Sequence, residues 1–499
     1  MTTAPAPIAP HPRPQPAVTS HPSIRPVLWI AHKEWLDLRR DARWRVLSGV
    51  TVLLMLAALA LGLLETRRLE REHRAAEAGD RQVWTAQGAK NPHSAAHFGQ
   101  YAFKPVGPLA LAEPGIDAHV GSAVYLEAHK QNEVQFRAAR DGTLAARMGH
   151  LTLALVLQTV MPLMAILLGF AAFSGERERG TLSQLLSLGV RPAQLLLGKA
   201  LASAGVLMGL LLIACAGLAA GLALFGSDHA AEVGGGGLRL AGMALGYSLY
   251  LLGFLALALA VSARARSSRT ALVGLLIFWL LNSFLVPRGV TDLVRNADPL
   301  STTLAFRAAI ADDKKSLFGH DENHPGFLAF RDRVLRQYQV KRVEDLPVSF
   351  RGLSLREDDE AGYRIFDRHF DKLQAQVERQ DAWRSAPGIL FPMLALQPVS
   401  MAMAGTDNRH HHHFAKAAEA HRRLIQTAAS QDLIDHAKNG DADYVASEST
   451  WARIPAFAYR QPGAGWAWQG QTRNLLTLTL WFSTCSALAW FAAQRPRVL

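Results

Sequence analysis

Four consecutive histidines, His410 to His413, form the densest group of potential metal ligands in the sequence, and His421 follows them. Thr406 and Asp407 precede the run as a helix cap, and in a helix His410 and His413 would share one face. Neutral imidazoles are good ligands for zinc or copper. No carboxylate or third imidazole can be seen to converge on them, however. We therefore predict no metal site, with His410 and His413 as the candidates if one exists, and a surface or packing role for the run.

The acidic, serine and cysteine residues of the sequence do not form a recognisable catalytic motif. The acidic run from Glu357 to Glu360 (EDDE) would point around a helix rather than into one cleft, so it is interpreted as a solvated face. The sequence has no serine elbow and no H-E-x-x-H motif. Its two cysteines, Cys215 and Cys485, both lie in apolar stretches. No catalytic residue is predicted.

A phosphate-binding loop is also missing from the sequence. The nearest candidate ends in LLLGKA at 195–200, where Ala193 stands in place of the first glycine of G-x-x-x-x-G-K-[ST]. Ala200 stands in place of the hydroxyl that would hold Mg²⁺. The chain is therefore not expected to be an enzyme by itself, and no cofactor is predicted in it.

Long apolar stretches determine the class of the protein. A helix needs about 20 apolar residues to cross a bilayer, because it rises about 1.5 Å per residue. Six stretches meet this length, so an all-α membrane protein with six transmembrane helices is predicted. The spans are expected at 45–64, 151–173, 200–225, 238–261, 270–287 and 474–493.

Charge indicates the orientation of these spans. The short loop at 263–269 (ARARSSR) and the C-terminal QRPRVL are basic, whereas the loop at 226–237 has two acids and no Lys or Arg. By the positive-inside rule, both termini are cytoplasmic in a bacterial inner membrane. The net charge of +12 is then a topology signal, and no nucleic-acid partner is predicted. The segments 65–150 and 288–473 lie outside.

The N-terminal part divides into a tail and an amphipathic helix. Residues 1–26 are rich in proline and are expected to form a disordered cytoplasmic tail. Residues 27–44 have apolar side chains at helical spacing, which predicts a helix at the lipid interface; the alternative is a soluble helix packed on the protein's own loops. Its interface residues would be Trp29, Trp35, Arg39, Arg40 and Arg43.

The two outer segments are expected to form one mainly helical domain. The sequence after the first span predicts that its helix continues as a stalk, and 118–150 is expected to return as a second stalk. In the second segment, helices are predicted at about 302–317, 326–340, 357–384 and 408–438. The uncharged stretch 386–406 contains three prolines, so an apolar patch of the outer domain is favoured over a seventh span.

A charged connector joins the second and third spans. Its sequence, GERERGTLSQLLSLGVRPAQLLLGK, falls within the predicted cytoplasmic loop 174–199. Thr181 can cap a short helix in which Leu182, Leu185 and Leu186 share a face. The connector is thus a small amphipathic helix at the inner surface, and the alternative is a plain solvated loop.

This arrangement resembles the permease subunits of type 2 ABC exporters. In those subunits the connector begins with two glutamates separated by a charged residue, and Gly-Thr follows them. A leucine pair, a turn and Gly-Lys come next. The same order of residues occurs here from Glu176 to Lys199. The resemblance covers about 27–64, 151–287 and 474–492. The stretch SMAMAGTDNRHHHHF at 400–414 looks like a motif of a subgroup that has a large external domain.

The resemblance implies that the connector is the coupling helix, which seats in a groove of an ATP-binding subunit. The residues to which this role is assigned are Glu176, Arg177, Glu178, Arg179, Gly180, Thr181, Leu182, Leu185 and Leu186. ATP and Mg²⁺ would be bound by the partner ATPase, and a second permease copy or a paralogue would complete the dimer. Two alternatives stay open: ATP-driven motion passed to a periplasmic partner without transport, and a motorless membrane scaffold or sensor.

Overall fold

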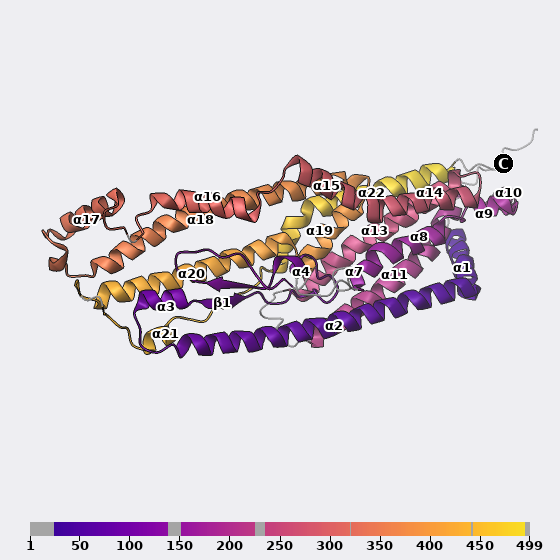
Figure 1. Ribbon diagram of the computed structural model, residues 1–499. Coiled ribbons are helices and arrows are strands. Elements are labelled where there is room, and N and C mark those ends of the chain that lie inside the picture. The colour runs from indigo at the N-terminus through magenta and orange to yellow at the C-terminus, as the bar shows by residue number, and fades with distance from the viewer. Residues whose placement is uncertain (1–23, 138–150, 225–234, 320, 441–442, 495–499) are drawn as a thin grey trace, which may run out of the picture.

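A computed structural model describes residues 24–137, 151–224, 235–319, 321–440 and 443–494. The molecule is elongated, with the apolar helices bundled at one end and long helices extending from them to the other end (Figure 1). Several sequence predictions concern residues outside the described ranges: residues 1–23 of the tail, 138–150 of the second stalk, most of the acidic loop and the basic C-terminus.

Six helices in the described ranges are long and apolar enough to cross a membrane, which confirms the predicted number of spans. Four of them are single helices: α2 (Ala42–Thr85), α11 (Pro192–Leu224), α13 (Gly236–Arg264) and α22 (Ala464–Gln494). The second span is made of α7 (Leu153–Leu155), η1 (Val156–Val160), α8 (Met161–Gly169) and α9 (Ser174–Glu178). The fifth span is made of α14 (Ser268–Leu280), η2 (Leu281–Leu285) and α15 (Val286–Ala297). The predicted all-α membrane fold is therefore correct.

The π-helical turns η1 and η2 each precede a proline, Pro162 and Pro287. A proline has no N–H to donate, and its ring clashes with the carbonyl four residues earlier, so a wider turn relieves the strain. For Pro162 that carbonyl belongs to Gln158, and it instead accepts a hydrogen bond from the hydroxyl of Tyr250 on α13, at 3.1 Å. The irregular turn thereby ties the second span to the fourth.

The predicted interfacial helix is α1 (Arg25–Arg40). It ends four residues earlier than expected because Asp41 has an extended backbone and caps α2, accepting from the Arg43 N–H at 2.8 Å. The helix α2 then runs unbroken for 44 residues, through the first span and the predicted stalk. Since α1 packs along α11, it is attached to the bundle on one side.

The first external segment does not return as a second helical stalk in its described part. It contains α3 (Pro92–Phe98), β1 (Gln100–Phe103), α4 (Asp117–Val120) and β2 (Ala123–Leu126). The strands pair antiparallel, with Tyr101 opposite Tyr125. Gly121, at φ +94°, ends α4, and the AVYL sequence that follows favours a strand because β-branched and aromatic side chains pack well across one.

The second external segment is mainly helical, as predicted. Its elements are α16 (Thr303–Asp313), η3 (Lys314–Ser316), α17 (Pro325–Tyr338), η4 (Val343–Asp345), α18 (Phe350–Ser385), η5 (Ala386–Ile389), α19 (Met393–Ala404), α20 (Asn408–His436) and α21 (Ser449–Arg453). The long helices α18 and α20 pack together and extend away from the bundle (Figure 1). At the far end, the Trp84 ring of α2 meets that of Trp451.

The proline-containing stretch 386–406 packs inside the protein. Its helix α19 has 12 residues, too few to span a bilayer, and it lies against the spanning helices α13 and α22. Ser400 hydrogen-bonds Tyr247 at 2.9 Å, and the Met393 N–H donates to Asn282 at 3.1 Å. The stretch is therefore an internally packed patch, as favoured from the sequence, but its packing partners are spanning helices rather than the outer domain alone.

Candidate functional site

The charged connector forms two short helices at the end of the bundle that faces away from the external domain (Figure 1). These are α9 (Ser174–Glu178) and α10 (Thr181–Ser187), and α11 begins at Pro192. Gly180 joins them at φ +73°, a left-handed conformation that glycine adopts without steric cost. The chain therefore turns sharply there and projects α10 from the bundle.

Glu176 lies at the centre of a buried ion-pair cluster. Its carboxylate is 3.1 Å from the ammonium of Lys199 on α11, which is also 2.7 Å from Glu34 on α1. The Thr181 hydroxyl donates to the same carboxylate, and Arg179 approaches it at 3.5 Å. Glu176 and Lys199 are only 6% and 4% exposed. This cluster fixes the connector to α1 and α11 at once.

Arg177 and Glu178 fasten the connector to the turn between the fourth and fifth spans. The Arg177 guanidinium donates to the carbonyls of Ala265, at 2.7 Å, and Ala263, at 2.9 Å. The Glu178 carboxylate accepts from the Ser268 N–H at 2.7 Å and from its hydroxyl at 2.9 Å. A cation at the end of α13 and an anion at the start of α14 both suit the helix dipoles.

The apolar face of α10 is turned toward the bundle. Leu182 is 1% exposed, and Leu185 and Leu186 are half-buried against the core. The outward face is polar and ends in Leu188, which is 80% exposed. The exposed residues of this face are Ser183, Gln184, Ser187 and Leu188, and Glu178, Arg179 and Gly180, which precede the helix, are exposed as well. Of the three leucines assigned to ATPase coupling, Leu182 thus anchors the helix to the bundle, whereas Leu185 and Leu186 keep part of their surface exposed.

Two contributions to this site were missed from the sequence. Glu34 could have been noticed, because it lies three residues after Ala31 and four before Leu38 on the packed side of α1. Ser174 and Ser262 were less apparent, since each is a single polar residue in an apolar stretch. The Ser262 hydroxyl accepts from the N–H of Ser174 at 3.2 Å, so it holds α9 to α13.

The predicted lipid-facing side chains lie on α1 and at the start of α2. Trp29 is 77% exposed and Trp35 is 40% exposed, and Arg39, Arg40 and Arg43 are exposed as well. They lie on the same short stretch as Glu34, which joins α1 to the connector. A motion of the connector would therefore also move this surface.

The structure does not bring His410 and His413 together as metal ligands. His410 is buried between Asp407, which hydrogen-bonds its Nδ1, and the Arg239 guanidinium, 3.2 Å from its Nε2. His413 instead contacts the Tyr459 hydroxyl at 2.9 Å. Burial alone would raise the pKa of the Asp407 carboxyl, but its bonds to His410 outweigh burial and lower that pKa. A guanidinium beside His410 disfavours a second cation there.

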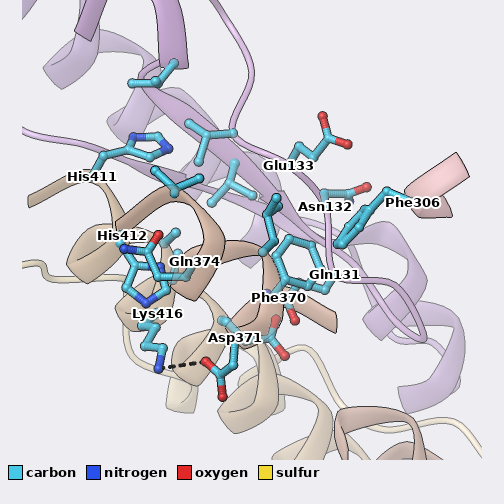
Figure 2. A pocket seen from close by; sticks show the side chains of 18 of the residues that line it. Gln131, Asn132, Glu133, Phe306, Phe370, Asp371, Gln374, His411, His412 and Lys416 are labelled. Carbon is cyan, nitrogen blue, oxygen red and sulfur yellow. Dashed lines mark ion pairs between the residues drawn. The ribbon is translucent and has the colours of Figure 1, made fainter. Parts of the chain in front are cut away.

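A cavity of about 770 Å³ lies in the external domain and was not predicted (Figure 2). It is bounded by α18, α20 and the stretch after β2. His411, His412 and Lys416 line one side, with Lys416 paired to Asp371 at 3.0 Å. Burial lowers the pKa of His411 to about 3, so its ring is neutral. The cavity is large enough for a small organic molecule and contains charges of both signs.

Two family models match this chain. The model described as ABC-2 family transporter protein matches residues 28–300, which include α1, five of the six spans and the connector. A domain of unknown function, DUF3526, matches residues 303–460, which include the helices α16 to α21. A comparison with curated proteins found no match. Since the first model covers more than half of the sequence, the chain belongs to the ABC-2 family of transporter proteins and is a membrane permease of an ABC system.

Proposed function

We propose that this permease is the membrane half of an exporter driven by separate ATPase subunits. Those subunits would bind ATP and Mg²⁺, because this sequence has no phosphate-binding loop. The permease would work as a dimer with a second copy or a paralogue. It would lie in a bacterial inner membrane with both termini in the cytoplasm, in accord with the basic short loops.

The attachment of the connector carries this proposal. Glu176 links it to α1 and α11 through Lys199, while Arg177 and Glu178 link it to α13 and α14. Four helices of the permease are therefore joined to one small projecting element. Its outward face, with Leu188 at the tip, is the surface on which an ATPase would dock.

The proposed mechanism is a change between two packed arrangements of the bundle. ATP binding would draw two ATPase subunits together, and each would carry the α10 that is seated on it. Because the connector is fixed to α1 and α11 by a buried ion-pair cluster and to α13 and α14 by hydrogen bonds, its displacement would move these four helices with it. An inward-open and an outward-open state would be stabilised in turn.

The helix α2 favours a second function, in which motion is passed outward without transport. Its 44 residues span about 66 Å without a break. At its outer end, the Trp84 indole donates to the Trp451 carbonyl at 3.1 Å, and the Trp451 indole donates to the Gly88 carbonyl at 2.7 Å. A displacement at the inner surface would thus reach the external domain. Substrate uptake by inside-out vesicles separates export from this alternative.

Co-purification tests the proposal against a motorless scaffold. The tagged permease would be purified from its own membranes as wild type, as Leu188→Glu and as Leu304→Glu. Leu304 lies on external α16 and is also 80% exposed, so it is a matched control. We expect an ATPase to co-purify with wild type and with Leu304→Glu, and its yield to fall about tenfold or more with Leu188→Glu. An ATPase yield that Leu188→Glu leaves unchanged, or no ATPase at all, would refute docking at α10.

A further inference from the structure

Three histidines of the external domain lie close together, away from the histidine run. His93 and His97 are on α3, and His129 is in the turn after β2. One nitrogen of each ring lies within 4.8 Å of the others, and the Nε2 atoms of His93 and His97 are 3.3 Å apart. Two nitrogens on a tetrahedral zinc ion, each about 2.0–2.1 Å from it, are separated by about 3.3 Å. The first pair therefore already has the spacing of metal ligands.

Local structure accounts for the position of the first pair. Asn91 caps α3 by accepting from the His93 N–H at 3.0 Å, and Pro92 starts the helix. His93 and His97 are one turn apart and hence lie on the same face. The helix α3 packs on α20, which fixes it to the rest of the domain.

His129 is held in place from two sides. Its Nδ1 is 2.9 Å from the buried carboxylate of Asp359 on α18, and its carbonyl accepts from the Lys314 ammonium at 2.7 Å. Its backbone is in the left-handed region, at φ +57°, which is uncommon for a residue other than glycine. A carboxylate on the distal nitrogen of a ligating histidine is the usual second-shell partner, because it sets the tautomer and makes the ring more basic.

We propose that His93, His97 and His129 bind a divalent transition-metal ion of the Zn²⁺ or Cu²⁺ type in the external domain. Three imidazoles suit these ions, whereas Mg²⁺ and Ca²⁺ prefer oxygen ligands. The group is half-buried to exposed, so an ion can enter from solution. The fourth position of a tetrahedron is filled by water or by a ligand from a partner molecule.

The site would join the two external segments. Its ligands come from the first segment, and their supporting carboxylate, Asp359, comes from α18 of the second. A bound ion would strengthen this link and hold α3 and α18 at a fixed separation. Metal binding would therefore stabilise the external domain, independently of whether the permease transports a substrate.

Titration of the full-length protein in detergent, after treatment with a chelator, tests the site with Zn²⁺ as the probe. The variants are His97→Ala, His129→Ala and Asp359→Asn, and His412→Ala is the control for the histidine run. We expect one Zn²⁺ per wild-type chain, a rise in melting temperature on binding, and the same behaviour in His412→Ala. Binding should be lost in both ligand variants and be about 10–100-fold weaker in Asp359→Asn.

A Cu²⁺ titration followed by electron paramagnetic resonance provides a second readout. Nitrogen hyperfine structure in the spectrum should require His97 and His129, and should persist in His412→Ala. Zn²⁺ binding that survives in His97→Ala and His129→Ala, or that is lost in His412→Ala, would overturn the assignment. Absence of binding to folded wild-type protein would do the same. Since these readouts use the permease alone, they are unaffected by failure of the ATPase-docking proposal.

Discussion

The ammonium of Lys199 lies 3.1 Å from the carboxylate of Glu176, and both groups are buried at the end of the bundle that bears the connector. The two residues occur in the connector and at the start of the third span. With Glu34 as the second partner of Lys199, they convert a charged loop into a rigid attachment.

Lys199→Met should separate docking from coupling. Removing the lysine takes away the buried cation that Glu176 and Glu34 share and leaves them only the exposed side chains of Arg179 and Lys33, so the free energy of unfolding should fall by about 3–5 kcal/mol. If the variant still folds, ATPase subunits should co-purify with it, but their ATP turnover should no longer respond to the permease. Arg68→Met removes an exposed ion pair with Glu72 on α2, away from this cluster, and is the control. Normal coupling in Lys199→Met would contradict a role for this pair.

Arg177→Lys tests the attachment to the fourth span while keeping the charge. A lysine cannot reach both carbonyls as the planar guanidinium does, so the end of α13 should be held less firmly. We expect a loss of at least half of the permease-dependent ATP turnover in liposomes, with unchanged ATPase binding. Arg266→Lys, at an exposed residue of the same turn, should have wild-type turnover. Equal effects of the two substitutions would argue against this attachment.

Glycines of α2 offer a matched test of packing. A Cβ at Gly62 would lie 2.0 Å from the Leu111 carbonyl oxygen, whereas a Cβ at Gly49 would meet nothing within 4 Å. Gly62→Ala should therefore lower the free energy of unfolding by about 1–3 kcal/mol, because the backbone of the first external segment must shift. Gly49→Ala should be neutral or slightly stabilising. Thermal unfolding in detergent measures both, and similar melting temperatures would refute this contact.

Acid should destabilise the external domain through His411. Burial is the main cause of its low pKa, about 3 in the folded protein against 6.5 ordinarily. Above pH 6.5 the ring is neutral in both states, and below it the unfolded state binds the proton first. Stability should therefore fall as pH drops from 6.5 toward 3, by about 1.4 kcal/mol per pH unit.

The variant His411→Gln isolates that contribution. When the pH is lowered from 6.5 to 5, the free energy of unfolding of this variant should fall by about 2 kcal/mol less than that of wild type, as measured by chemical unfolding. His436→Gln, at a side chain that is 60% exposed, is the control. If the two variants respond to acid alike, His411 is not protected from protonation.

Local patterns were sufficient for the spans and for the existence of the connector. The lengths of the apolar stretches predicted the six spans. A segment that crosses lipid must satisfy its backbone hydrogen bonds internally, so few structures other than a helix are possible for it. The leucine spacing predicted α10, but Thr181 is its first residue rather than its cap: Gly180 occupies the cap position, and the Thr181 hydroxyl donates to Glu176. The direction of its apolar face could not be predicted, because that depends on Leu182 finding a pocket among other helices.

Contacts between distant residues could not be predicted from the sequence. Glu34 and Lys199 are 165 positions apart, so no local pattern in the sequence indicates that they form an ion pair. The strands β1 and β2 are only four residues long, too short for a clear alternation. The spacing of His93 and His97 was a usable signal for metal ligands, but His129 joins them only through the fold.

Photo-crosslinking from Leu188 tests the central claim most directly. A photo-reactive amino acid would replace Leu188 in intact membranes, with the same replacement at Leu304 as the control, and captured proteins would be identified by mass spectrometry. If the outward face of α10 seats the motor, Leu188 captures an ATP-binding subunit and Leu304 does not. Capture of no nucleotide-binding protein from Leu188 in folded, expressed permease would contradict the claim.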